Sequence, residues 1–193
     1  MNPGLTLSVT RAFEIFLNAL GFFLIARVFS LDSLGDFYSA YAGLMIVQVV
    51  SAFGLNAGIS AEYKRTQKNR TDLVSSVYAT RVIIILIIAV ISLFVDISPD
   101  LKTLFVVFCI SEIFKTSVFI NFILEYELQF NQVAFSRIVT VIGGFLARVI
   151  VIWFEQPLLI LCMTYIFEGI LVFLFEIHFC KKLDVAFSAK SID

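Results

Sequence analysis

Six long apolar runs, separated by short polar breaks, limit what this chain can fold into. A helix that rises about 1.5 Å per residue needs roughly 20 residues to cross the hydrocarbon of a bilayer, and each run reaches that length. We therefore expect an all-α membrane protein, a bundle of six transmembrane helices over residues 1–180 with a cytoplasmic tail or linker at 181–193. The expected helices are 6–28, 37–61, 73–95, 102–124, 133–154 and 157–179.

The composition supports a membrane protein and argues against a soluble domain. Hydrophobic residues make up 60% of the chain and charged residues 15%, whereas an average soluble domain has about 25% charged residues. The 22 phenylalanines suit helix surfaces that face membrane lipids. The only basic cluster adjoins an apolar run, so no nucleic-acid partner is expected.

The breaks between the runs carry turn-forming residues. We expect a tight polar turn from Ser30 to Asp36, in which Gly35 can adopt a positive φ. Asp72 and Asp100 are expected to cap the helices that follow them. The other breaks fall at 69–72, 98–100, 129–132 and 155–157.

The distribution of basic residues predicts the orientation of the bundle. Lysine and arginine concentrate in cytoplasmic loops, and here they cluster on the side of the membrane that holds both chain ends. Both termini are therefore expected in the cytoplasm, with the chain as a multi-pass protein of the cell inner membrane. That side holds Arg11, Lys64, Arg65, Lys68, Arg70, Arg137, Lys181, Lys182 and Lys190, and the other only Arg27 and Lys102.

Several charged residues fall deep inside the expected helices. A charge in hydrocarbon costs several kcal/mol, so such residues face protein or water. A single polar lumen that all of these residues face explains their positions better than six unrelated placements of charge. Alternatives remain for single residues: Glu112 and Lys115 could pair on one helix, as could Arg11 and Glu14, and Arg148 could extend to the interface. The deep charges are Glu14, Arg81, Glu112, Lys115, Arg148 and Glu168.

Catalytic motifs are not apparent in the sequence. The chain has a single histidine, scattered cysteines, and neither a glycine-rich phosphate loop nor a serine nucleophile elbow. We therefore expect no enzyme activity, no metal site and no cofactor. Intramembrane carboxylates leave a polyprenyl-lipid transferase as a weaker possibility.

Two stretches resemble a known transporter family. The first combines Ala26-Arg27, 34–38 (LGDFY), 53–55 (FGL) and Lys64-Arg65, and the second is 134–171. In this order and spacing they resemble the polysaccharide-biosynthesis flippases, the O-antigen translocases of the multidrug/oligosaccharidyl-lipid/polysaccharide exporter superfamily. The chain departs from the family at 30–32 (SLD), where a Gly-Pro or similar pair is usual.

The resemblance implies a function and a set of partners. Flippases of this family move polyprenyl-diphosphate-linked oligosaccharide repeat units across the cytoplasmic membrane by alternating access, with two six-helix lobes around a cavity that is often cationic. This chain would be the N-terminal lobe, and its partners would be the lipid-linked oligosaccharide, membrane lipids and a second six-helix lobe. That second lobe would be either a missing C-terminal half or a second copy.

The resemblance also assigns roles to the deep charges. The cations would line the lumen and bind the diphosphate, and the acids would tune the cations or carry a coupling proton. The alternative function is a non-transporting membrane subunit of a polysaccharide-synthesis complex, in which the charges only pair with one another. The lumen cations would be Arg11, Arg81, Lys115 and Arg148, and the acids Glu14, Glu112 and Glu168.

Overall fold

The computed structural model describes residues 3–52, 59, 62–63, 65 and 70–182, and every element it assigns in this part of the chain is a helix. The elements are α1 (Pro3–Val28), α2 (Leu31–Ala52), α4 (Arg70–Phe94), α5 (Pro99–Lys115), the 3₁₀ helix η1 (Thr116–Phe119), α6 (Ile120–Tyr126), α7 (Phe130–Trp153) and α8 (Leu158–Lys182). The expected all-α architecture is therefore confirmed.

Within the described residues, five helical segments are long and apolar enough to cross a membrane, by length and composition. They lie in α1, in α4, in the continuous rod of α5, η1 and α6, in α7 and in α8. The described part of α2 is not among them, and most of the second half of the expected helix 37–61 lies outside the described residues. The basic loop at 64–70 also lies mostly outside them. Of the expected tail 181–193, the first two residues belong to α8, and the rest lies outside the described residues. A multi-pass membrane bundle with five such helices follows.

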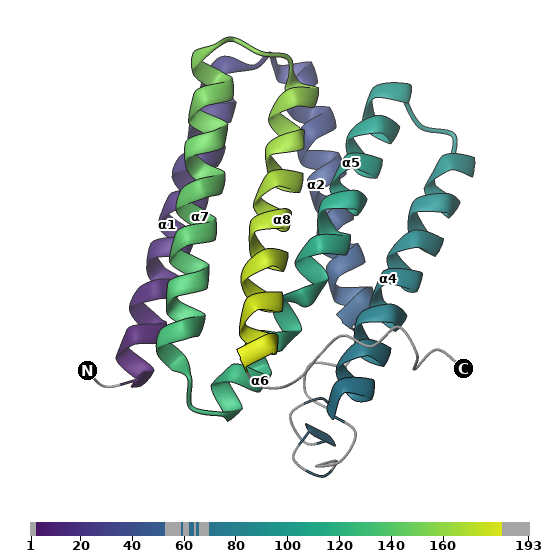
Figure 1. The fold of residues 1–193 in the computed structure, drawn as a ribbon. Coiled ribbons are helices and arrows are strands. Elements are labelled where there is room, and N and C mark those ends of the chain that lie inside the picture. The colour runs from purple at the N-terminus through teal and green to yellow at the C-terminus, as the bar shows by residue number, and fades with distance from the viewer. Residues whose placement is uncertain (1–2, 53–58, 60–61, 64, 66–69, 183–193) are drawn as a thin grey trace.

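The helices pack as two groups joined by α8 (Figure 1). Helix α1 packs along α7, while α2, α4 and α5 contact one another, and α8 contacts both α7 and α5. Helix α1 begins and α8 ends at the same end of the bundle, which we call the terminal end. The opposite end, the loop end, holds the three short connections at 29–30, 95–98 and 154–157.

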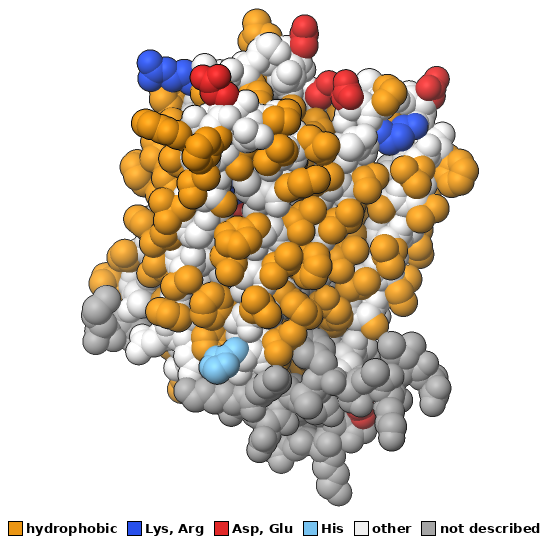
Figure 2. Space-filling view, turned by 45° about the horizontal axis from the view of Figure 1, so that its top comes forward, with side chains coloured by type: hydrophobic (Ala, Val, Ile, Leu, Met, Phe, Trp, Pro, Cys, Tyr) orange, Lys and Arg blue, Asp and Glu red, His pale blue; other side chains and the backbone are white. Residues whose placement is uncertain are grey.

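The surface and the interior both suit a membrane. Figure 2 shows hydrophobic side chains covering the visible flank, with charged side chains gathered at the loop end. Inside, one apolar cluster around Phe37, Phe108 and Leu161 fills the loop end. A second cluster around Phe119 and Ile123 fills the terminal end. A third, smaller cluster around Val47, Ile85 and Cys109 joins α2, α4 and α5.

The expected turn from Ser30 to Asp36 is wrong, because α2 already begins at Leu31. The Ser30 hydroxyl accepts a hydrogen bond from the backbone N–H of Ser33 at 3.4 Å, and this satisfies a donor of the first helical turn. Asp32 also lies in that turn, where a negative charge interacts favourably with the helix dipole. Polar residues that resemble a loop in the sequence therefore start the helix, and Gly35 lies inside it without a positive φ.

The cap of α5 also differs from the expectation. The Ser98 hydroxyl, and not Asp100, accepts the hydrogen bond from the backbone N–H of Leu101, at 3.3 Å. Pro99 is the first helical residue, a position where its missing N–H costs nothing. Asp100 lies in the first turn and interacts with the helix dipole instead.

The expected helix 102–124 is interrupted in its middle. Helix α5 ends at Lys115, and four residues of 3₁₀ helix precede α6. The Thr116 hydroxyl donates to the carbonyl of Glu112 at 2.9 Å, and the Ser117 hydroxyl to that of Phe114 at 3.0 Å. Such bonds to the preceding turn often bend helices. The interruption places Lys115 at the point where the rod changes its geometry.

Candidate binding cavity

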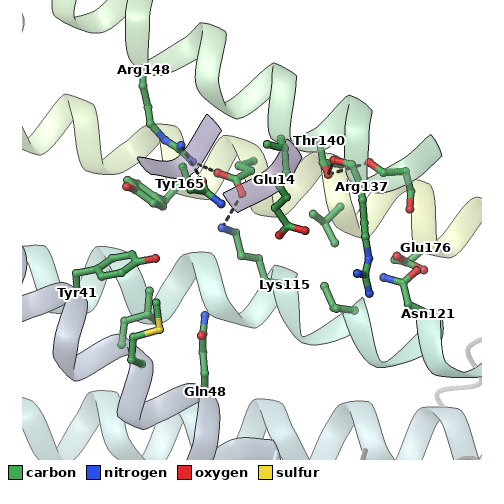
Figure 3. Close-up of a pocket in the computed structure, with 18 residues that line it drawn as sticks. Glu14, Tyr41, Gln48, Lys115, Asn121, Arg137, Thr140, Arg148, Tyr165 and Glu176 are labelled. Atoms are coloured by element: carbon green, nitrogen blue, oxygen red, sulfur yellow. Dashed lines mark hydrogen bonds and ion pairs between the residues drawn. The ribbon is translucent and has the colours of Figure 1, made fainter. Parts of the chain in front are cut away.

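A polar cavity of about 400 Å³ lies among α1, α2, α7, α8 and the α5–α6 rod. Figure 3 shows side chains from these elements converging on it. On α7, the spacing of Arg137, Val141 and Arg148 places all three on one face of the helix, and all three line the cavity. Helix α8 contributes Glu168 and Glu176, two helical turns apart.

An ion-paired triad occupies the middle of the cavity. Lys115 Nζ on α5 donates to Oε1 of Glu168 on α8 at 3.0 Å. Arg148 Nη2 on α7 donates to the other oxygen, Oε2, of the same carboxylate. Glu168 is 9% exposed and Arg148 only 3%. One buried carboxylate therefore joins three helices through two cations.

Arg148 is held in place by further contacts. Its Nη1 lies 3.5 Å from Oδ1 of Asn18 on α1. Its guanidinium carbon lies 4.4 Å from the ring centroid of Tyr165, within the range of a cation–π interaction. Lys115 Nζ lies 5.4 Å from the same ring centroid. Arg148 points inward, so it does not extend to the membrane interface.

The terminal end of the cavity contains a second group of polar residues. Arg137 Nη2 on α7 lies 3.7 Å from Oε1 of Glu125 on α6. Glu176, which is 1% exposed, and Asn121, which is 3% exposed, line the cavity nearby. The sequence interpretation missed Glu176. Its spacing of eight residues from Glu168 was the available signal, because that spacing returns to nearly the same helix face.

A second cavity of about 340 Å³ lies beside the first, against α4. It is lined by Arg81 from α4, by Glu112 from α5 and by Gln48 from α2. Gln48 Nε2 donates to Oε2 of Glu112 at 2.8 Å, and Arg81 Nη1 lies 3.5 Å from the carbonyl oxygen of Thr116. Lys115 lines both cavities.

The deep charges are thus distributed over two adjoining cavities, whose linings share Gln48, Lys115 and Val118. The first cavity receives Glu14, Lys115, Arg148 and Glu168, and the second receives Arg81 and Glu112. Arg11 is exposed on α1 and lines neither cavity. Glu112 and Lys115 do not form the ion pair that was one alternative from the sequence. Glu112 accepts a hydrogen bond from Gln48, and Lys115 donates to Glu168.

Among the described residues that line it, the first cavity is balanced in formal charge. Its basic side chains are Lys115, Arg137 and Arg148, and its acidic ones are Glu14, Glu168 and Glu176. The expectation of a cationic lumen therefore needs one change, because each of these cations has an acidic partner: Lys115 and Arg148 pair with Glu168, and Arg137 pairs with Glu125. Across the described part of the chain, no group of three or more histidine, cysteine, aspartate or glutamate side chains could hold a metal ion.

Comparison with family models, with curated proteins and with solved structures finds no match. The class of protein therefore follows from the fold and the cavity alone. The chain is an α-helical, multi-pass membrane protein with a polar, charge-bearing cavity inside its bundle.

Proposed function

We propose that this protein is one lobe of a transporter that moves polyprenyl-diphosphate-linked oligosaccharide repeat units across the cytoplasmic membrane by alternating access. The observation that carries the proposal is the triad of Lys115, Glu168 and Arg148 in a cavity within an apolar bundle. Buried ion pairs are expensive to desolvate and contribute little net stability. A pair of cations beside an open volume is better explained by a ligand that carries negative charge.

The chemistry of the triad fits a diphosphate. Guanidinium and ammonium groups bind phosphate oxygens with charge-assisted hydrogen bonds. Glu168 places its two carboxylate oxygens on Lys115 and Arg148, in the positions that two phosphate oxygens would take. In this proposal the substrate displaces the carboxylate, which returns to the cations after the substrate leaves.

The proposal includes the topology and the partners. Helix α2 is the sixth transmembrane helix, and the terminal end of the bundle faces the cytoplasm. A second six-helix lobe, either a continuation of this chain or a second copy, completes the transporter. The chain acts by transport and not by catalysis.

The test is export in cells in which the chromosomal gene carries the variant. In cells with Arg81→Gln and Arg148→Gln together, lipid-linked repeat units should accumulate on the cytoplasmic leaflet, and surface polysaccharide should fall. Arg11→Gln is the matched control, since Arg11 is exposed and outside both cavities. Membrane levels of each variant are measured by immunoblot. Normal export in the double variant at normal protein level would contradict the proposal.

A second candidate is a non-transporting subunit of a polysaccharide-synthesis complex. The balanced charge of the first cavity and the full pairing of Glu168 favour it, because a purely structural network needs no free cation. The same export assay separates the two functions, with a variant in which Lys115, Arg148 and Glu168 are all changed to glutamine. In a non-transporting subunit the three charges only pair with one another, so removing them together should preserve function at normal protein level, whereas a substrate site needs the cations.

A further inference from the structure

Two unpaired oxygens lie at the terminal end of the first cavity. Among the described residues, neither Oε2 of Glu176 on α8 nor Oδ1 of Asn121 on α6 has a hydrogen-bond partner. Glu176 is 1% exposed and Asn121 3%, yet both line the cavity. The two side chains lie beside one another, close enough for the Asn121 amide to donate to the Glu176 carboxyl group. Buried polar atoms in native proteins are almost always paired, so these two point to a missing partner.

The neighbouring hydroxyls on α7 have already used their protons. The Ser136 hydroxyl donates to the carbonyl of Val133 at 3.1 Å, and the Thr140 hydroxyl donates to that of Ser136 at 2.8 Å. Both side chains line the same cavity. A hydroxyl that has donated its only proton still carries lone pairs and can only accept. This end of the cavity therefore collects acceptor oxygens from α6, α7 and α8.

The charged groups around Glu176 do not fill this role. Arg137 is near enough to act on the Glu176 carboxyl group electrostatically, but its described ion pair, at 3.7 Å, is with Glu125. Lys115 and Arg148, the other two cations of the cavity, are held by Glu168. Glu14 adds a further negative charge to the cavity wall. The two carboxylates of α8 thus differ: Glu168 is doubly paired, and Glu176 keeps one oxygen without a donor.

We propose that Glu176 and Asn121, with the Ser136 and Thr140 oxygens, form a binding site for a small monovalent cation, either a sodium ion or a proton. Carboxylate, amide and hydroxyl oxygens are hard ligands that suit hard cations. One carboxylate without a donor on Oε2 matches one positive charge. The site depends on the cavity alone and stands whether or not the protein transports lipid-linked sugars.

The test uses the full-length chain in lipid nanodiscs. Binding of ²²Na⁺ is measured by scintillation proximity with choline as the replacement cation, and proton binding is measured by difference infrared spectroscopy of carboxyl groups. We expect either saturable ²²Na⁺ binding or the C=O band of a protonated buried carboxyl, and we expect Glu176→Gln to abolish that signal. Glu112→Gln is the matched control, since it also removes a buried carboxylate but one that Gln48 already pairs.

If Glu176→Gln does not fold, a measurement on the unmodified protein still tests the proposal. A sodium ion that competes with a proton for Glu176 should release protons when NaCl, but not choline chloride, is added to weakly buffered protein. Asn121→Leu, which removes one acceptor oxygen, should weaken whichever signal is present. If wild type shows neither ²²Na⁺ binding nor a protonated buried carboxyl, or if the signal survives in folded Glu176→Gln, the proposal is overturned. Neither result depends on export, so the proposed function stands or falls separately.

Discussion

Gly144 on α7 faces Glu168 on α8 so closely that a Cβ atom at Gly144 would lie 2.7 Å from Oε2 of Glu168. It would also lie 2.9 Å from Cδ and Cγ of the same side chain. Because Gly144 has no side chain, the Glu168 carboxylate can occupy the space beside it and lie between its two cations. Gly143, beside it, allows close helix packing, because a Cβ there would lie 2.9 Å from Cδ1 of Leu171.

Gly144→Ala should displace Glu168 and weaken its bonds to Lys115 and Arg148. Overpacking a tight contact costs about 1–3 kcal/mol, and we expect the free energy of unfolding in mixed micelles to fall by that amount. Gly35→Ala is the control, because a Cβ at Gly35 meets nothing within 4 Å. In helical backbone this second change should stabilise by about 0.4–1 kcal/mol. Equal effects of the two substitutions would contradict the assigned role of Gly144.

Glu168→Gln should destabilise the fold more than either Lys115→Gln or Arg148→Gln. It leaves two cations without their buried carboxylate, and removing one partner of a buried ion pair costs about 3–5 kcal/mol. The triple variant, in which all three residues become glutamine, should be more stable than Glu168→Gln alone, because no charge is left unpaired. Denaturant unfolding of the four variants measures these differences. Additive losses across the triad would show that the three charges act independently.

A cysteine at Met45 should react with a water-soluble maleimide, and one at the next residue, Ile46, should not. Met45 on α2 lines the first cavity, whereas Ile46, although 66% exposed, does not, and we place it against lipid. Thiolates form in water and not in hydrocarbon, so water in the cavity decides the rate. The native cysteines are buried, which keeps the background low. If Met45→Cys reacts no faster than an unreactive Ile46→Cys, the cavity is dry, and if both react, Ile46 does not face lipid.

The two ends of the bundle should label from opposite sides of the membrane. Gln156 is exposed in the connection between α7 and α8 at the loop end, and Asn131 is exposed near the start of α7 at the terminal end. An impermeant maleimide added to intact cells should modify Gln156→Cys, while Asn131→Cys should react only after the membrane is opened. The reverse pattern would invert the proposed orientation.

The observed helices start at other residues than the sequence predicts, and the reason is local chemistry. Ser30 and Ser98 resemble loop residues, yet each hydroxyl accepts the first backbone hydrogen bond of a helix. Turn and cap residues are the same residue types, so composition alone does not separate them. The 3₁₀ segment after Lys115 was also missed, because apolar periodicity continues through it.

The sequence by itself determined that this chain is an α-helical membrane bundle and that charges lie inside it, because the length and polarity of each run are local properties. Only the tertiary structure decided which charges meet. Glu168 bonds to Lys115 from fifty-three residues away and to Arg148 from twenty, while Arg11 meets neither cavity and Glu176 enters the first. Helix periodicity gives the face on which a residue lies, but not the neighbour that the face packs against. That neighbour is set by packing between helices, and here packing distributes the deep charges over two adjoining cavities that share Gln48, Lys115 and Val118.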